Sequence, residues 1–362
     1  MTLGPDIAER LNRARVDLRA GVPIVMEESD RGALVFAAET LDPRRFHAAR
    51  DKGAMVLVIT DRRAETLRSP AYDGDIARIM VPQSAGVEWI RSVADPASDL
   101  AVPLKGPFKP VRDGGASLAR AAVSVVKSAR LLPAALVVPI KDAGAFASAE
   151  GLTALPAADI ARTIASPLVL NPVVHARLPI SASEAGQLYV FRPEDGGEEH
   201  YAVEIGQPPR DKPVLARLHS ACFTGDLLGS LKCDCGPQLH GALAQMGTEG
   251  AGLLLYLNQE GRGIGLANKM RAYSLQDQGF DTVEANHRLG FEDDERDFRL
   301  GAAILKRMGF QSVRLLTNNP AKIRMMEANG VVVTERVPLK VGHTAHNAGY
   351  LATKAAKSGH LL

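Results

Sequence analysis

The chain has almost no excess charge of either sign and no long apolar stretch, and each absence excludes a class of protein. Its 362 residues carry 43 Lys plus Arg against 41 Asp plus Glu, a formal net charge of +2. Proteins that coat nucleic acid have strongly basic surfaces, so we expect no nucleic-acid partner. The longest apolar run, 131–140, contains prolines and is too short to cross a bilayer. We therefore also expect no membrane partner.

Cysteine is scarce, and the first residues do not look like an export signal. With an odd total of three cysteines, the chain has no sign of a disulfide framework. Residues 1–21 have the pattern of a polar helix and lack the apolar core of a signal peptide. Both observations favour a reducing compartment, and the expected location is cytoplasmic.

Alternation of apolar strands with helical stretches predicts the fold class. Segments such as GAMVLVIT (53–60) are typical of buried strands, whereas 43–52 and 117–131 have helical patterns. We expect an α/β (α+β) protein with two domains, each a mixed sheet packed with helices. The pattern loosens near Val174, which predicts domains at 1–174 and 175–362.

In the second half, the boundaries between predicted strands and helices are clearer. Pro320, for example, suits the first turn of a helix because its missing N–H needs no partner there. In chain order we expect a strand at 214–219, a helix at 238–247, a strand at 252–258, a helix at 266–278, a long polar loop at 282–298, a helix at 297–308, a strand at 312–317, a helix from Pro320 and a strand at 331–337.

All three cysteines fall within one short segment, CFTGDLLGSLKCDCG, as Cys222, Cys233 and Cys235. Thiols clustered in this way indicate a metal site. Zinc with three protein ligands keeps a position for water and is typical of catalysis, whereas structural zinc has four ligands. His219 or His240 could supply the fourth ligand, so the structural alternative stays open at this point.

Two further segments have the character of anion sites. QEGRGIG follows a strand and opens a helix, where free N–H groups attract phosphate, and Arg262 adds a cation. An ordinary tight turn is the alternative there. TNNPAKIR places Thr317 and Lys322 at another strand-to-helix junction. The acidic stretch at 293–297 is either a solvated helix start or part of a lid over a charged substrate.

Several motifs in one order resemble GTP cyclohydrolase II, from about Arg217 to the end of the chain. They are ARLHSACFTGDLLGSLKCDCG, NQEGRGIGLANKMRAYSLQDQGFDTVEANHRLGF, DDERDF, LLTNNPAK and YLATKAAKSGHLL. The resemblance implies a hydrolase that opens the guanine ring of GTP, releasing formate and pyrophosphate, in the first step of riboflavin biosynthesis. It also implies a homodimer, with one Zn²⁺ per subunit and Mg²⁺ on the GTP phosphates.

The resemblance assigns roles to individual residues. It implies that Cys222, Cys233 and Cys235 bind zinc, that Asp294 accepts a proton and that Tyr273 positions the attacking water. Arg296 matches a proposed nucleophile on the α-phosphorus, although a guanidinium more easily gives electrostatic stabilisation. The implied GTP contacts are Arg217, Leu218, His219, Ser220, Ala221, Gln238, Glu260, Gly261, Arg262, Thr282, Thr317 and Lys322. The family often has Glu where this chain has Ala221.

The first half resembles 3,4-dihydroxy-2-butanone 4-phosphate synthase, in GVPIVMEESDRGALVFAAE and in PFKPVRDGGASLARAAVSVVKSARLLPAALVVPI. Ala33 stands where that family has the last acid of its first motif, and residues 117–121 lack its metal-binding His. Alanine cannot ligate Mg²⁺. We expect a domain that keeps the fold without the synthase reaction, and interpret Glu27, Glu28 and Asp30 as solvated loop residues. The alternatives are a working bifunctional enzyme and a non-catalytic, zinc-stabilised nucleotide-binding protein.

Overall fold

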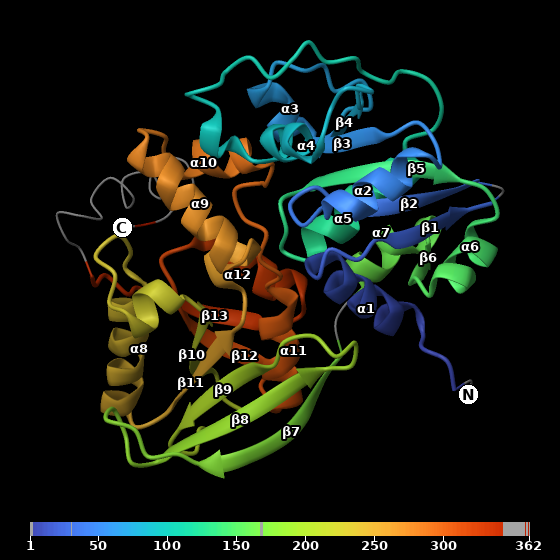
Figure 1. Cartoon of the computed structure of the whole chain (residues 1–362). Helices are drawn as coiled ribbons and strands as arrows, with labels where there is room; N and C mark the ends of the chain where they lie inside the picture. Colours follow the sequence, from blue (N-terminus) through green and yellow to red (C-terminus); the bar gives the residue numbers. More distant parts are fainter. Residues whose placement is uncertain (1–2, 30, 167–168, 343–358, 360, 362) are drawn as a thin grey trace. The chain divides into compact units, whose positions relative to one another are not determined.

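The computed structural model describes residues 3–29, 31–166, 169–342, 359 and 361 (Figure 1). Asp30 and most of the terminal motif lie outside the described residues. By packing, the chain divides into two compact units. Unit 1 comprises Met1–Ser166 together with Ala267–Asp294, and unit 2 comprises Pro167–Leu266 and Glu295–Leu362. Part of the second half therefore packs with the first, and the functional boundary near residue 174 stays a prediction.

Unit 1 is built on a six-stranded sheet in the order β4-β3-β5-β2-β1-β6. Its neighbours are antiparallel except β1 and β6, which are parallel. The strands are β1 (Ile24–Glu28), β2 (Arg31–Ala37), β3 (Val56–Thr60), β4 (Ile76–Met80), β5 (Ala134–Ile140) and β6 (Ala154–Pro156). The helices are α1 (Ile7–Arg19), α2 (Pro43–Arg50), α3 (Asp61–Thr66), α4 (Val87–Ala94), η1 (Pro96–Ser98), α5 (Ser117–Ser128), α6 (Ala143–Glu150), α7 (Ala157–Ala165), α9 (Leu266–Asp277) and α10 (Thr282–Leu289).

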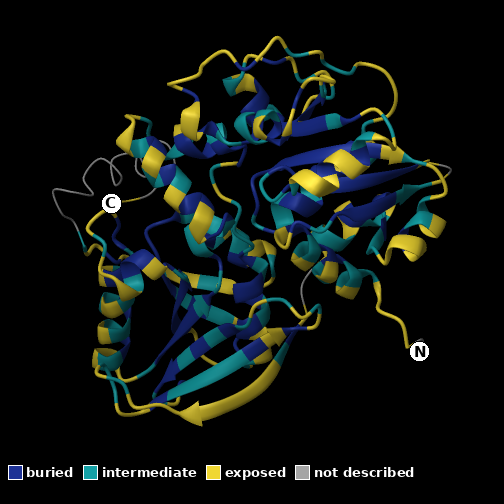
Figure 2. Ribbon diagram, viewed as in Figure 1, coloured by how far each residue is buried: buried dark blue, intermediate teal, exposed yellow. Residues whose placement is uncertain are grey.

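The core of unit 1 lies between its sheet and helices α1, α5 and α7. Leu18 of α1, Val125 of α5 and Ile160 of α7 share one buried cluster with Met26 and Val35 from the strands. Figure 2 shows these strands as largely buried. The helix patterns at 43–52 and 117–131 correspond to α2 and α5, and the apolar run predicts β5.

Unit 2 is built on a seven-stranded sheet in the order β13-β12-β10-β11-β9-β8-β7. Strands β13, β12, β10 and β11 are parallel to one another, and β9, β8 and β7 extend the sheet from β11 by antiparallel pairs. The strands are β7 (Leu170–Arg177), β8 (Gly186–Pro193), β9 (His200–Ile205), β10 (Val214–Ser220), β11 (Gly252–Leu257), β12 (Ser312–Leu316) and β13 (Val332–Val337). The helices are η2 (Phe223–Leu227), α8 (Cys235–Glu249), η3 (Glu260–Gly263), α11 (Arg299–Arg307) and α12 (Pro320–Ala328).

The central parallel strands β10 and β11 of unit 2 are buried on both faces. Side chains alternate along a strand, so Ala216 of β10 joins the cluster that contains Ile304 of α11, whereas Leu215 joins the cluster that contains Met246 of α8. Because both sheets contain parallel and antiparallel pairs and pack against helices, the predicted fold class is confirmed.

One predicted element is wrong. Residues 282–298 were expected to form a long polar loop, but α10 occupies Thr282–Leu289. The helix begins with a capping box, in which Asp281 accepts from the backbone of Glu284 and the Glu284 side chain accepts from the backbone of Asp281. That D-x-x-E signal is visible in the sequence, where the high charge density obscured it. Within the part of the chain that is described, no helix has the length and apolar character to span a bilayer.

Candidate active site

Three neighbouring parallel strands of unit 2 end at one edge of the sheet. From β10 the chain passes to β11 on one side, and β12 then pairs with β10 on the other side. Strand order thus reverses at β10, and in open α/β sheets such a reversal creates a crevice beyond the carboxyl ends of the strands. The cysteine segment follows β10, the glycine turn follows β11, and Thr317 follows β12. The topology therefore brings together the three segments that the sequence singled out.

The three cysteines form one cluster. Cys222 follows β10, Cys233 lies in the segment before α8, and Cys235, two residues later, is the first residue of α8. Their sulfur atoms all lie within 4.8 Å of one another, and those of Cys222 and Cys233 are 3.9 Å apart. Three soft thiolate donors at this spacing suit a zinc ion. The sequence prediction that these side chains converge is confirmed.

Gly225 leaves room for an ion among the three sulfurs. A Cβ atom at this position would lie 2.7 Å from Sγ of Cys233 and 3.1 Å from Sγ of Cys222. The backbone N–H of Gly225 also donates to Sγ of Cys222 at 3.3 Å. Any larger residue would push into the sulfur cluster, so the loop has the shape of a metal cradle.

A buried carboxylate orders the loop behind Cys222. Asp226 accepts hydrogen bonds at 3.0 Å from the backbone N–H of Cys222 and from the hydroxyl of Tyr256. Nε2 of His219 lies 3.0 Å from both oxygens of Asp226, and the His219 ring stacks on Tyr256 at 5.6 Å between centroids. Burial lowers the pKa of His219. Sequence reasoning missed Asp226 and Tyr256, since an isolated acid in FTGDLLG and a strand tyrosine carry no motif of their own.

Neither histidine proposed as a fourth ligand joins the cluster. His219 is engaged with Asp226, and Nδ1 of His240 lies 2.9 Å from the carbonyl oxygen of Gly236. Over the described ranges, the group of side chains able to share a metal consists of the three cysteines alone. The geometry of these residues favours the open, three-ligand alternative.

Arg217 is a buried cation beside the cluster. It lies on β10 with only 6% of its surface exposed, donates to the carbonyl oxygen of Leu316 at 3.2 Å and donates to the amide oxygen of Gln238. Burial lowers its pKa to about 10, which still leaves the guanidinium charged at neutral pH. Its Nε and the hydroxyl of Ser220 are buried polar atoms without a hydrogen-bond partner among the described residues. Such orphaned atoms are typical of a site that binds a polar ligand.

Two more cations share one aromatic ring. The guanidinium of Arg296 lies 4.8 Å from the centroid of Phe298, and Nζ of Lys322 lies 5.4 Å from the same centroid. Lys322 of α12 is buried and donates to the carbonyl oxygen of Leu218 on β10 at 2.9 Å. Arg296 also depresses the pKa of Arg217, although less than burial does. Positive charge is thus concentrated at the carboxyl edge of the sheet.

The glycine turn after β11 adopts an unusual backbone. Gly261 and Arg262 both have left-handed conformations, with φ of 62° and 59°. This is rare for a residue with a side chain such as Arg262, and strain of this kind occurs at functional sites. Glu260 fixes the turn: one carboxylate oxygen accepts from the N–H of Gly261 at 2.9 Å and the other from the N–H of Phe223 at 2.6 Å. The turn is therefore tied to the cysteine segment.

Other predicted contact positions have local structural partners. The hydroxyl of Thr317 accepts from the N–H of Asn319 at 3.0 Å, ahead of α12. The backbone N–H of Ala221 donates to the carbonyl oxygen of Leu257 at 2.8 Å. These positions lie at the same edge as Arg217.

Three predicted site residues belong to unit 1. Tyr273 is on α9, with Nζ of Lys269 5.8 Å from the centroid of its ring. Thr282 is the first residue of α10, and its hydroxyl accepts from Gln276 at 3.1 Å. Asp294 is the last residue of the returning segment of unit 1. Since the cysteines lie in unit 2, a shared site with these three residues is a proposal.

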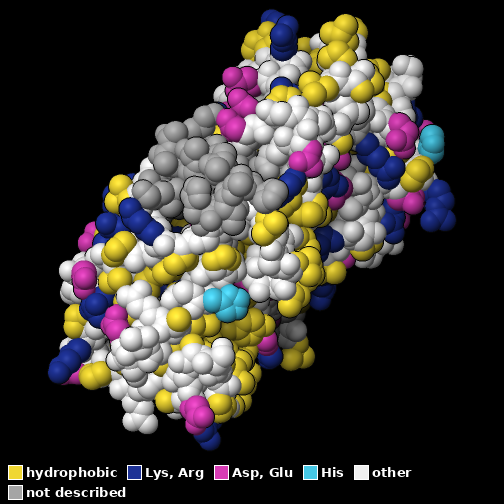
Figure 3. All heavy atoms as spheres, turned by 90° about the vertical axis from the view of Figure 1, so that its left-hand side faces the viewer, with side chains coloured by type: hydrophobic (Ala, Val, Ile, Leu, Met, Phe, Trp, Pro, Cys, Tyr) yellow, Lys and Arg dark blue, Asp and Glu magenta, His cyan; other side chains and the backbone are white. Residues whose placement is uncertain are grey.

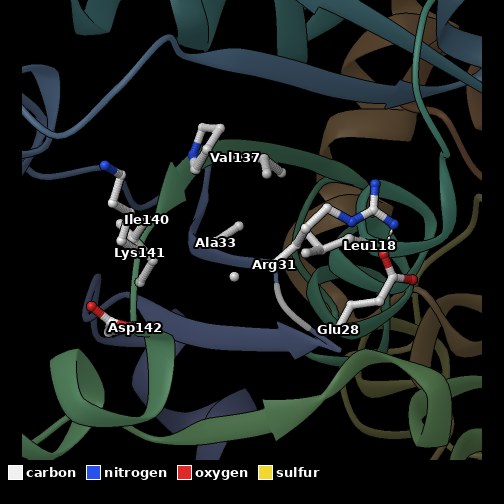
Figure 4. A pocket seen from close by; sticks show the side chains of 10 residues that line it. Glu28, Arg31, Ala33, Leu118, Val137, Ile140, Lys141 and Asp142 are labelled. Carbon is white, nitrogen blue, oxygen red and sulfur yellow. Dashed lines mark hydrogen bonds and ion pairs between the residues drawn. The ribbon is translucent and has the colours of Figure 1, made fainter.

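Unit 1 has a cavity of its own, of about 420 Å³. Ala33 and Leu118 line it, so the two segments that resemble the synthase meet there. Figure 4 shows the ion pair of Arg31 and Glu28 on one side of the cavity. Lys141 and Asp142 line the opposite side. The full lining is Glu28, Arg31, Gly32, Ala33, Leu118, Val137, Pro139, Ile140, Lys141 and Asp142. Its described residues do not form a group able to hold a metal.

The described surface carries charges of both signs. On the face drawn in Figure 3, Lys and Arg side chains are interspersed with Asp and Glu, in line with the balanced composition. The basic groups at the carboxyl edge of unit 2 are local and largely buried, as Arg217 and Lys322 show.

Comparison with known proteins agrees with this geometry. A family model for GTP cyclohydrolase II matches residues 171–338. The chain is 43% identical to GTP cyclohydrolase-2 of Azospirillum brasilense, covering 97% of this chain and 94% of that protein. It is 55% identical to GTP cyclohydrolase-2 of Azotobacter vinelandii, over 48% of this chain and 84% of that one.

Two further proteins match parts of this chain. Riboflavin biosynthesis protein RibBA of Bacillus mycoides is 59% identical over 46% of this chain and 42% of its own length. The crystal structure of RibBX, a two-domain 3,4-dihydroxy-2-butanone 4-phosphate synthase from A. baumannii, aligns over 92% of this chain and 100% of that chain at 18% identity, with a TM-score of 0.32. The near full-length match to a GTP cyclohydrolase-2 decides the assignment: the chain belongs to the GTP cyclohydrolase II family of hydrolases.

Proposed function

We propose that this enzyme hydrolyses GTP to formate, pyrophosphate and 2,5-diamino-6-hydroxy-4-(5-phosphoribosylamino)pyrimidine, the first step of riboflavin biosynthesis. The observation that carries the proposal is the cluster of three cysteines beside the buried Arg217 at the carboxyl edge of one sheet. Cys222, Cys233 and Cys235 would hold one zinc ion. When bound, zinc supplies a Lewis acid that lets water ionise near neutral pH.

The cations of unit 2 suit the triphosphate. GTP carries about four negative charges, which Arg217, Lys322 and Arg296 offset together with Mg²⁺. Arg217 can present its unpartnered Nε without losing its bonds to Leu316 and Gln238. Such a buried, held guanidinium costs little reorganisation when the phosphates arrive.

The guanine edge requires both donors and acceptors. Glu260 is held by two backbone N–H groups and offers an acidic acceptor for the N–H groups of guanine. Gln238 adds an amide, and the orphaned hydroxyl of Ser220 adds a donor. The remaining proposed contacts are Leu218, His219, Ala221, Gly261, Arg262, Thr282 and Thr317.

The reaction consumes water at two places in GTP. A first water adds to C8 and opens the imidazole ring, a second releases that carbon as formate, and a third cleaves the bond between the α- and β-phosphates. Tyr273 positions the attacking water by its hydroxyl, and Asp294 accepts the proton that this water loses. Arg296 stabilises charge on the α-phosphoryl group, a role that a permanently protonated guanidinium fills without losing a proton.

The first half is proposed to have lost the synthase reaction. Where the two resembling segments meet, Ala33 and Leu118 line the cavity, and neither side chain can ligate Mg²⁺. We also propose that the protein is a cytoplasmic homodimer, as the family resemblance implies, and sedimentation equilibrium would test the dimer.

The decisive experiment is product identification after incubation with GTP, Mg²⁺ and Zn²⁺. We expect formate, pyrophosphate and the pyrimidine in equal amounts, with no turnover after chelation and recovery on adding zinc. Cys233→Ser should abolish formate release and lower the zinc content. Normal turnover by a zinc-free Cys233→Ser protein would refute the metal assignment. Binding of GTP without formate would favour the non-catalytic alternative, and butanone phosphate from ribulose 5-phosphate would favour the bifunctional one.

A further inference from the structure

The segment Ala267–Asp294 leaves unit 2 after Leu266, packs in unit 1, and returns to unit 2 at Glu295. It carries Tyr273, Thr282 and Asp294. We infer that residues 1–166 act as a scaffold that holds this segment in its catalytic position, so that a unit without its own chemistry is required for the hydrolase reaction. The inference rests on the proposed function, in which Tyr273 and Asp294 take part.

The first anchor is Arg271, two residues before Tyr273. Its guanidinium donates to Glu39 at 2.9 Å and to Asp95 at 3.2 Å, and also to the side-chain oxygen of Asn268 at 2.7 Å. Glu39 is fixed in turn, because its other oxygen accepts from the N–H of Leu132 at 2.8 Å. The Arg271 side chain is only 25% exposed. One arginine therefore ties α9 to two separate parts of the first 166 residues.

Asn268 adds a second link on α9. It is fully buried, and its amide donates to the carbonyl oxygen of Arg130 at 2.9 Å. Because Asn268 also accepts from Arg271, the two side chains form one connected network. A buried polar network of this kind specifies a single position for the helix.

The second anchor holds the end of α10, which packs against α3 (Figure 1). The hydroxyl of Thr60 donates to the carbonyl oxygen of Gly290 at 2.9 Å in a buried setting. Gly290 ends the helix with φ of 88°, and a Cβ there would lie 2.8 Å from the Thr60 hydroxyl and 3.0 Å from Pro133. Backbone contact this close requires glycine, so the chain fits the scaffold at this point without a gap.

The third anchor lies two residues before Asp294. Glu292 forms an ion pair with Arg62 at 3.0 Å, and the guanidinium makes further hydrogen bonds to it at 3.2 and 3.3 Å. The adjacent Arg63 is buried and donates to the carbonyl oxygen of Arg288 at 3.4 Å. Arg288 also lies 3.7 Å from Asp99. The segment 267–294 is thus held close to Tyr273 near one end and close to Asp294 at the other, and these are the two residues proposed to act on water.

This placement assigns unit 1 a positioning function. Catalysis depends on reacting groups within fractions of an ångström, and a displacement of about 1 Å can cost roughly 100-fold in rate. The cations proposed to bind the phosphates are all in unit 2, and of the proposed GTP contacts only Thr282 lies on the segment 267–294. Loosening the anchors should therefore lower kcat with little change in the KM for GTP.

The test is Arg271→Met in the full-length, zinc-loaded protein, with Arg120→Met as the matched control. Arg120 also makes a bidentate ion pair in unit 1, with Asp75 at 2.6 and 2.7 Å, but does not contact the catalytic segment through it. We expect kcat for formate release, per bound zinc, to fall roughly 10- to 100-fold in Arg271→Met. Arg120→Met should match the wild type, and KM should change less than threefold in both.

A charge exchange supplies the second measurement. Arg62→Glu and Glu292→Arg should each lower kcat a few-fold, since the pair is half-exposed, and the double variant should recover most of the loss. If Arg271→Met does not fold, Glu39→Gln gives the same comparison. Wild-type turnover combined with undiminished kcat in Arg271→Met or Glu39→Gln overturns the scaffold. Absence of formate from the wild type would instead count against the proposed function.

Discussion

Nε2 of His219 lies 3.0 Å from both carboxylate oxygens of Asp226. Through the same carboxylate, Asp226 holds the backbone N–H of Cys222 at 3.0 Å. His219, one of the two histidines that the sequence offered as a fourth metal ligand, therefore supports the loop that carries Cys222. Outer partners of this kind orient the ligands of a metal site.

The first prediction concerns Asp226→Asn. The amide cannot accept all three hydrogen bonds that the carboxylate accepts, so the Cys222 loop should lose its fixed geometry. We expect zinc affinity to fall roughly 10- to 100-fold, measured by competition with a chromophoric chelator. Asp211→Asn, at an exposed position of the same unit, serves as control. Equal zinc affinity in the two variants would contradict the role of Asp226.

The second prediction tests the cradle through Gly225→Ala. The added Cβ would lie 2.7 Å from Sγ of Cys233, so zinc and turnover should be lost together although every ligand is retained. Gly241→Ala is the control, since its Cβ would find its nearest neighbour, on Leu339, at 3.4 Å. Metal analysis of both variants decides the matter, and a fully loaded Gly225→Ala protein would show that the loop can move aside.

The third prediction distinguishes charge from shape at Arg217. Arg217→Lys keeps a cation but cannot bond Leu316, Gln238 and a phosphate at once, because Lys lacks the planar fork. One lost hydrogen bond to a charged group is worth about 1.5–3 kcal/mol, so KM for GTP should rise at least about tenfold. Arg314→Lys, on the neighbouring strand β12 and paired with Glu249 and Glu335, should leave KM unchanged. Steady-state kinetics with both variants measures the difference.

The fourth prediction is acid sensitivity of unit 1. Burial alone would raise the pKa of Asp99, but hydrogen bonds and charge from Arg63 and Lys105 outweigh burial and hold the pKa below its ordinary value. Arg288 adds a third cation at 3.7 Å. The stabilisation is therefore complete above about pH 4 and is lost as the pH falls through the lowered pKa.

Asp99→Asn should remove much of that acid dependence and cost about 3 kcal/mol of unfolding free energy at pH 7, because buried cations lose their partner. Asp75→Asn is the control, since its exposed pair with Arg120 should contribute below about 1 kcal/mol. Thermal unfolding between pH 3 and 7 compares the three proteins. A wild-type stability that does not change on acidification would contradict the prediction.

Sequence patterns predicted the elements whose signals are local. The strand at 134–140 follows from one apolar run, and α12 begins at Pro320 as the proline indicates. The cysteine cluster was equally accessible, because its three cysteines lie in one short segment of the sequence. In contrast, α10 was missed although Asp281 and Glu284 mark its start.

What the sequence could not reveal depends on partners far apart in the chain. The bond between Asn268 and Arg130 joins residues 138 positions apart, and that between Arg271 and Glu39 spans 232. Neither pair has a periodicity or a motif that would link its members. The same limit hid the role of Asp226 of η2, which depends on Tyr256 of strand β11.

The out-and-back path of the chain has a consequence for how such proteins can diverge. A recombination crossover at residue 174 would combine residues 1–166 from one parent with α9 and α10 from another, although these parts pack together in one unit. If the parents differ at Glu39, Asp95 or Arg62, the recombinant protein loses the pairs that these residues form with Arg271 and Glu292. We therefore expect residues 1–166 and 267–294 to be inherited together, because their contacts are kept only when both ranges come from the same parent.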